Sequence, residues 1–141
     1  MNRIITLTLP GELIFARFAS ETAAKAALLL INSCDGGADD WKFTHAFELA
    51  VSEAFTNTVS YAQKPASPQP VTIDFIFEKQ CLTVTIRDTN PPFSIETPAP
   101  DIESYPERGY GLLLMRTVMD TVTCARENGT NIISMSKQLN P

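Results

Sequence analysis

The chain has 141 residues, with 44% hydrophobic and 19% charged residues and a net charge of -5 at pH 7. This length fits one hydrophobic core, so residues 1–141 are expected to form a single domain. Excess negative charge opposes nucleic acid backbones, so direct DNA or RNA binding is disfavoured. The longest apolar run, 26–31, has six residues, far below the roughly 18 that span a membrane. No secretory leader pattern is seen either, so we expect a cytoplasmic protein with no membrane contact.

Cysteine and histidine are too sparse for the common metal sites. The three cysteines, Cys34, Cys81 and Cys124, are widely spaced and form no CxxC pair. This pattern predicts neither a disulfide framework nor a zinc knuckle. The single histidine, His45, excludes multi-histidine metal sites. It falls on the polar face of a predicted helix, which favours a solvated side chain over a ligand or phosphoacceptor.

The first half of the chain predicts one strand followed by two helices. Alternating apolar residues predict a strand over 4–9, closed by a Pro-Gly pair. The Ala and Leu rich segment 12–32 predicts a helix, and a glycine-containing loop follows over 34–40. We expect an aspartate of that loop to cap a second helix that ends near Ala62, before a Pro and Ser rich stretch.

The second half predicts two hairpins. Segments 71–77 and 81–88 alternate around a tight polar turn, and segments 121–126 and 130–139 flank an Asn-Gly turn. Together with the helices they predict an α+β fold, a two-layer sandwich of a mostly antiparallel sheet with about three helices on one face.

A proline-rich loop and a third helix separate the two hairpins. Five prolines within residues 89–108 exclude regular structure there. A loop of about 20 residues inside a small domain is typical of a lid or a binding loop. Residues 109–120 predict the third helix, whose apolar part begins at Leu112.

The second helix predicts both a core face and a polar flank. At 100° per residue, its apolar face consists of Phe43, Phe47, Ala50, Val51, Ala54 and Ala62. Asn57 and Glu53 lie one turn apart on one flank of this face. Taken alone, each is most simply a helical amide or a surface carboxylate. Asparagine is a poor helix former, however, and half-burying it costs free energy unless its amide finds partners, which a ligand or cation would supply.

Two further positions suit ligand binding. Asp88 ends an apolar strand where it meets the predicted lid. It either initiates a turn or, facing a pocket, accepts a hydrogen bond from an exocyclic amine. Gly109 and Gly111, preceded by Arg108, open the third helix, where backbone N–H groups favour phosphate. A flexible hinge is the alternative. The glycines follow no strand of a βαβ unit and no GKS or GKT occurs, so neither a Rossmann site nor a P-loop is predicted.

These segments, taken in order, match four sequence boxes. The boxes are ELAVSEAFTNTVSYA (48–62, N box), VTIRDTNPPF (84–93, G1), ERGYGLLLMRTVMD (107–120, G2) and NGTNI (128–132). In series they resemble the GHKL, or Bergerat, ATP-binding fold of the histidine kinase-like ATPases. Within that group the chain is most similar to the bacterial anti-sigma-factor serine/threonine kinases of the RsbW and SpoIIAB type.

The resemblance implies a role for each matching position. Asn57 would hold a Mg²⁺ ion that bridges the ATP phosphates, and Glu53 would be the general base toward a serine hydroxyl. Asp88 would accept a hydrogen bond from the adenine amine, and Thr130 would support adenine recognition. The remaining nucleotide contacts implied by the boxes are Arg108, Gly109, Tyr110, Gly111 and Leu112.

The resemblance also implies partners, with one departure from the pattern. A bacterial sigma factor, an anti-anti-sigma protein with a STAS fold and a second copy of the chain are the implied partners. The third G1 position, usually glycine, is Asn90 here. Among residues other than glycine, asparagine best tolerates a left-handed backbone. Asn90 supports an alternative, a non-catalytic nucleotide-binding module that acts by partner contact alone. A histidine-kinase catalytic domain ranks last, since only one strand and one helix precede the N box.

Overall fold

The computed structural model describes residues 3–34, 41–60, 68–91 and 108–139, with 108–111 described by their backbone alone. In chain order the elements are β1 (Arg3–Pro10), the 3-10 turn η1 (Leu13–Phe15), α1 (Ala16–Ser33), α2 (Trp41–Ser60), β2 (Pro70–Glu78), β3 (Cys81–Asp88), α3 (Arg108–Val118), β4 (Thr121–Glu127) and β5 (Thr130–Gln138).

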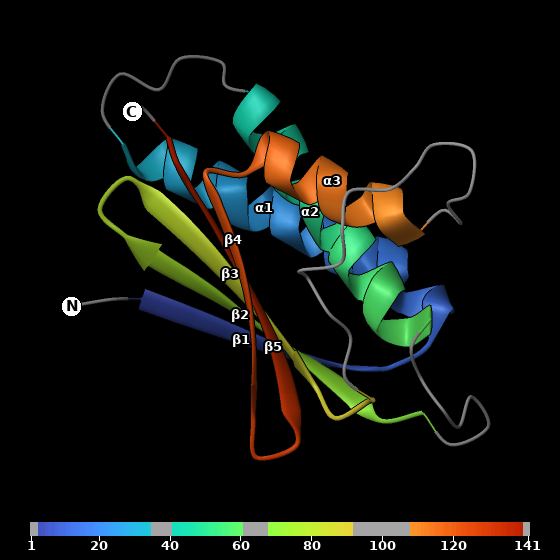
Figure 1. The fold of residues 1–141 in the computed structure, drawn as a ribbon. Helices are drawn as coiled ribbons and strands as arrows, with labels where there is room; N and C mark the ends of the chain where they lie inside the picture. Colours follow the sequence, from blue (N-terminus) through green and yellow to red (C-terminus); the bar gives the residue numbers. More distant parts are fainter. Residues whose placement is uncertain (1–2, 35–40, 61–67, 92–107, 140–141) are drawn as a thin grey trace.

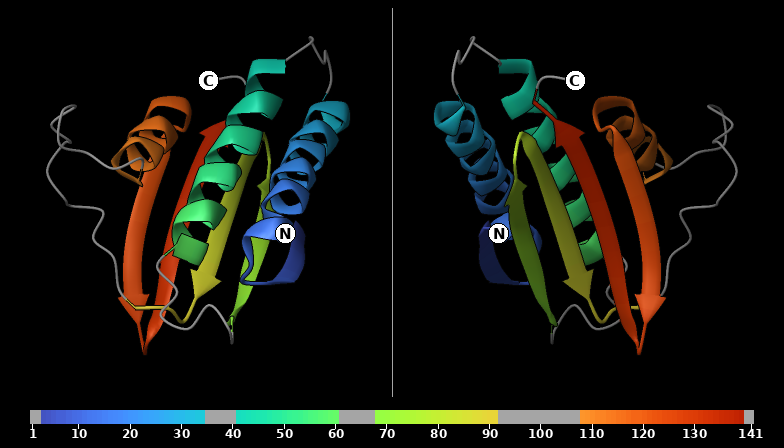
Figure 2. Two further views of the ribbon diagram at one scale, coloured as in Figure 1. Left: turned by 90° about the vertical axis from the view of Figure 1, so that its right-hand side faces the viewer. Right: turned by 90° about the vertical axis from the view of Figure 1, so that its left-hand side faces the viewer.

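The described elements form two layers. A five-stranded antiparallel sheet of order β1-β2-β3-β5-β4 carries the helices on one face (Figure 1). Helix α2 lies between α1 and α3 (Figure 2). This confirms the predicted α+β sandwich. Inserting β5 beside β3 leaves β1 and β4 as the edges and places the ends of β3 and β5 under the middle of the helical layer.

The core lies between α2 and the inner face of the sheet. Five residues predicted for the apolar face of α2 are at most 1% exposed: Phe43, Phe47, Ala50, Val51 and Ala54. The sixth, Ala62, lies outside the described residues. Alternate residues of β3 and β5, such as Ile86 and Ile133, complete this core. The buried face of α2 therefore fixes its rotation, and with it the direction of the flank that carries Glu53 and Asn57.

One of the two hairpin turns follows from residue type, and the other does not. Asn128 and Gly129 adopt φ values of 52° and 79°, as the predicted Asn-Gly turn requires. Lys79, in the turn between β2 and β3, has φ 54°.

Three predicted boundaries need correction. The segment predicted as one helix over 12–32 begins with the 3-10 turn η1, because Glu12 is extended and provides no side-chain cap. Helix α3 begins at Arg108, one residue into the predicted loop, and ends at Val118 instead of Asp120. Asp120 already belongs to the sheet edge, since its N–H donates to the Ser136 carbonyl at 2.9 Å. Loop residues 92–107 lie outside the described part.

No helix in the described part of the chain is long and apolar enough to cross a membrane.

Truncating the α2 core should be costly. We expect Phe47→Ala, at a fully buried ring, to lower the free energy of unfolding by about 3 to 5 kcal/mol. Phe18→Ala, at a ring on α1 that is 54% exposed, should cost far less. Urea unfolding followed by circular dichroism measures both, and equal losses would contradict the burial pattern.

Candidate functional site

Buried polar residues gather where β3 ends beneath the last turn of α2. Asp88 is 3% exposed and Asn90 6% exposed, whereas Thr58 is fully buried. The Asn90 backbone N–H donates to Asp88 Oδ1 at 2.9 Å, and the Asn90 side-chain Nδ2 donates to the Thr58 carbonyl at 2.9 Å. Asn90 therefore joins the strand end to the helix end through two hydrogen bonds.

Asn131 of β5 holds the same turn from the other side. Its Cα pairs with that of Asp88, and its Nδ2 donates to Asp88 Oδ1 at 3.0 Å and to the Asn90 carbonyl at 2.9 Å. A longer contact of 3.3 Å reaches the Pro91 carbonyl. Asn131 is 2% exposed, so these bonds form away from water and rigidify the turn.

Arg126 of β4 fixes the orientation of the Asn131 amide. Its guanidinium donates to Asn131 Oδ1 at 2.7 Å and to the Asn90 carbonyl at 3.2 Å. Since guanidinium groups only donate, the amide oxygen must face Arg126 and the amide nitrogen must face Asp88. Four elements thus contribute to one hydrogen-bonded cluster, consisting of Thr58, Asp88, Asn90, Arg126 and Asn131.

Two buried oxygen atoms of this cluster lack a partner among the described residues. They are Asp88 Oδ2 and Thr58 Oγ1. Of the two interpretations of Asp88, turn initiation is confirmed, and the contact with an exocyclic amine stays a prediction. Its Oδ1 initiates the turn through Asn90, and its Oδ2 remains a buried acceptor. Burying a carboxylate oxygen without a donor is costly, and a ligand N–H group would remove that cost.

The Asp88 carboxylate acts on a thiol of β4, which β5 separates from β3. Cys124 of β4 is half-buried on the face that packs against the core. Burial raises the pKa of the Cys124 thiol above its ordinary value, and the nearby Asp88 carboxylate raises it further.

The flank of α2 points its two candidate residues toward the same end of the fold. Asn57 is 5% exposed, and Glu53, one turn earlier, is half-buried. The hydrogen bond to the Asn57 carbonyl comes from Ser60 Oγ at 2.9 Å. Within the described residues no hydrogen bond engages the Asn57 side-chain amide. Its oxygen is of the kind that coordinates Mg²⁺.

The glycine-containing segment lies in the first turn of α3. Arg108, Gly109, Tyr110 and Gly111 are helical in the structure, and Leu112 packs half-buried against the core. Helix α3 packs beside α2 (Figure 2).

Thr130 lies apart from this cluster. It pairs with Glu127 across the β4–β5 hairpin, and the next residue, Asn131, is the one opposite Asp88. Successive side chains in a strand point to opposite faces. The inward set of β5, with Ile133 and Met135 buried, includes Asn131 and excludes Thr130. The role expected of Thr130 thus remains a prediction.

Sequence reasoning missed Thr58, Arg126 and Asn131. Side chains alternate between the two faces of a strand. This alternation predicts that Asn131 of β5 shares the inward face with Ile133, and that Arg126 of β4 shares a face with Val122 and Cys124. No comparable signal marked Thr58, because its significance depends on a strand end 30 residues away in sequence.

His45 and the cysteines take no part in the site. His45 is exposed and lies beside Trp41, with ring centroids 6.3 Å apart. All three cysteines are free. In the described ranges no group of three His, Cys, Asp or Glu residues could hold a metal ion.

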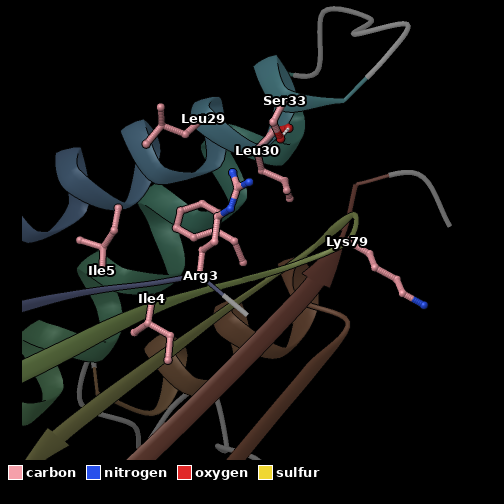
Figure 3. A pocket seen from close by; sticks show the side chains of 8 residues that line it. Arg3, Ile4, Ile5, Leu29, Leu30, Ser33 and Lys79 are labelled. Atoms are coloured by element: carbon pink, nitrogen blue, oxygen red, sulfur yellow. Dashed lines mark hydrogen bonds between the residues drawn. The ribbon is translucent and has the colours of Figure 1, made fainter. Parts of the chain in front are cut away.

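A cavity of about 540 Å³ lies elsewhere, between β1 and the C-terminal part of α1 (Figure 3). Its lining is largely apolar, with Arg3 and Lys79 as cationic members. Lys79 belongs to the turn that starts β3, whereas Asp88 ends that strand. The cavity is thus at the opposite end of the sheet from the polar cluster and contains none of the predicted site residues.

Comparison with known proteins shows the family of the chain. Residues 17–137 match the histidine kinase-like ATPase domain. The chain belongs to this family. It is similar to the serine-protein kinase RsbW of Listeria monocytogenes serotype 4a (strain HCC23), with 27% identity over 99% of the chain and 90% of the relative. It is also similar to the serine-protein kinase RsbW of Bacillus subtilis (strain 168), with 35% identity over 66% of the chain and 63% of the relative. The resemblance predicted from the four boxes is therefore confirmed at the level of the family.

The electrostatic link between Asp88 and Cys124 predicts a change in thiol reactivity. Because the thiolate is the reactive form, removing the negative charge with Asp88→Asn should lower the pKa of Cys124 and speed its alkylation by iodoacetamide near pH 8. Mass spectrometry of the alkylated peptides gives the rate, with Cys81 as the internal reference. An unchanged Cys124 rate would show that no charge on Asp88 acts on the thiol.

Proposed function

We propose that this chain binds Mg²⁺-ATP and is an anti-sigma-factor serine/threonine protein kinase. The observation that carries the proposal is the buried Asp88 carboxylate, which has one oxygen engaged within the fold and the other free. A free acceptor that is rigidly held suits the exocyclic amine of adenine. Membership of the histidine kinase-like ATPase family and the names of the RsbW relatives support the same function.

The nucleotide would lie between the flank of α2 and the start of α3. Asp88 Oδ2 would accept from the adenine amine, with Thr130 supporting recognition as the resemblance implies. The side-chain oxygen of Asn57 would hold Mg²⁺, which neutralises phosphate charge when bound. The phosphates would meet the N-terminal turn of α3, where the backbone offers unpaired N–H groups. The residues proposed there are Arg108, Gly109, Tyr110, Gly111 and Leu112.

Glu53 would act as the general base. Its carboxylate would take the proton from a serine hydroxyl of the protein substrate while the serine oxygen attacks the γ-phosphorus. The bond from that phosphorus to the bridging oxygen of ADP breaks, so phosphoserine and ADP are the products. Glu53 and Asn57 share one flank, one helical turn apart, so base and metal ligand can serve the same phosphoryl group. Phosphoryl transfer needs mainly such positioning and charge neutralisation.

The proposed macromolecular partners are a sigma factor, held by the chain, and a STAS-type anti-anti-sigma protein, which it phosphorylates. Both follow from the resemblance, as does a homodimer, and the proposed cytoplasmic setting follows from the composition of the chain. The exposed apolar side chains of Ile4 on edge strand β1 and of Phe18 and Leu29 on α1 support an apolar contact surface.

A non-catalytic binding module is the second candidate function. Its support is Asn90, which replaces the usual G1 glycine and ties the turn to Thr58. A turn held in this way has less freedom to move during a catalytic cycle than one with glycine.

Replacing the proposed base should separate binding from catalysis. We expect Glu53→Ala to slow transfer of labelled phosphate from ATP to the STAS partner by about 10² to 10⁴, the usual contribution of a general base, while ATP still binds. Glu48→Ala, at a half-buried carboxylate of the same helix, is the matched control. Undiminished transfer by Glu53→Ala would remove Glu53 as the base. A partner left unlabelled by the wild-type protein would favour the non-catalytic module.

Replacing the adenine acceptor should abolish nucleotide binding. We expect neither Asp88→Ala nor the isosteric Asp88→Asn to show saturable ATP binding by calorimetry, since both lose the carboxylate. Glu78→Ala, at an exposed carboxylate at the far end of β2, should bind as the wild type does. Unchanged ATP affinity in Asp88→Asn would refute the assignment of Asp88 to adenine.

A further inference from the structure

The hydroxyl group of Thr58 is unexplained by the fold. Threonines inside helices commonly donate to the carbonyl one turn earlier. Thr22 does so to Phe18 at 2.7 Å, and Thr117 does so to Leu113 at 2.8 Å. Thr58 is fully buried, yet its Oγ1 has no partner among the described residues. A buried hydroxyl that makes no intrahelical bond is available to something outside the helix.

The unpartnered Thr58 hydroxyl belongs to the same cluster as the unpartnered oxygen of Asp88. Asn90 contacts both residues, through its backbone N–H to Asp88 and through its side chain to the Thr58 carbonyl, each at 2.9 Å. Both ends of the Asn131 amide are already engaged. Asn131 Nδ2 is engaged by Asp88 and the Asn90 carbonyl, and Asn131 Oδ1 is engaged by Arg126. In the described part of the chain, Thr58 Oγ1 and Asp88 Oδ2 are the buried side-chain oxygens of the cluster that have no partner, and both are available to a ligand.

These two atoms complement one edge of a base. A carboxylate oxygen accepts, and a hydroxyl can donate. The amidine edge of adenine offers the reverse pair, a donor at the exocyclic amine N6 and an acceptor at the ring nitrogen N1. Guanine presents an acceptor at O6 and a donor at N1, so its O6 would face the Asp88 carboxylate.

We propose that Thr58 is a specificity-determining residue of the nucleotide site, whose hydroxyl donates to adenine N1 while Asp88 Oδ2 accepts from N6. This inference rests on the proposed function, because it assigns a second contact to the same ATP site. It identifies the recognised group as a 6-aminopurine with an unprotonated N1. Thr58 is a binding residue here and takes no part in phosphoryl transfer.

The test combines one variant series with two nucleotides. Wild type, Thr58→Val and Thr58→Ser are titrated with ATP and with 1-deaza-ATP, which keeps the amine but has a C–H group in place of N1. We expect Thr58→Val to weaken ATP binding about five- to tenfold, the range of one hydrogen bond. The variant should leave 1-deaza-ATP binding within twofold of the wild type. Thr58→Ser, which keeps the hydroxyl, should retain most of the ATP affinity.

A stability measurement excludes a folding defect as the cause. Valine has nearly the shape of threonine and removes a buried hydroxyl that has no partner, so the ligand-free Thr58→Val variant should melt no lower than the wild type. Binding and ligand-free stability should thus respond differently, which a purely structural role for Thr58 would not produce.

The outcomes distinguish the two proposals. Equal weakening of ATP and 1-deaza-ATP by Thr58→Val, or no weakening of either, would overturn the N1 contact while leaving the proposed function intact. Failure of the wild-type protein to bind ATP at millimolar concentration would overturn the proposed function and this inference with it.

Discussion

The pairing of Asp88 with Asn131 is the interaction on which the site depends. Asp88 is the last residue of β3, and Asn131 lies near the start of β5. The two residues are 43 apart in sequence and pair directly in the sheet. It satisfies one carboxylate oxygen and thereby fixes where the other lies. Arg126 orients the Asn131 amide, and Asn90 carries the arrangement across to α2. A buried network of this kind specifies one geometry because every lost bond would leave a desolvated polar group.

Helix α2 connects the core to the site. One face, with Phe47 and Val51 fully buried, is held against the sheet by apolar burial, which stabilises the helix without regard to chemistry. The flank next to that face carries Glu53 and Asn57, and Thr58 lies on the buried face itself. Burial of the apolar face fixes the rotation of α2, and this rotation sets the direction of these side chains. A ligand that met this flank would encounter groups whose orientation had been set before it arrived.

Asn90 changes the character of the G1 turn. Glycine at this position would leave the backbone free, whereas Asn90 gives a side-chain hydrogen bond to the carbonyl of Thr58. Asn90 therefore joins the strand end that carries Asp88 to the helix that carries Thr58. The asparagine side chain at this position thus makes a contact that glycine has no side chain to make.

The sequence by itself determined the elements, the fold class and the family. Hydrophobic periodicity depends on local spacing, so the sequence predicts the buried face of α2 that includes Phe47. The positive φ angles at Asn128 and Gly129 follow from residue type. The four boxes identified the family. Only the tertiary structure decided which polar groups meet. Strand order and register place Asn131 opposite Asp88 and leave Thr130 on the other face, and the helix layer brings Thr58 over the turn. Long-range pairing of this kind follows from how the sheet is ordered and how α2 packs on it, and neither leaves a periodic signal in the chain.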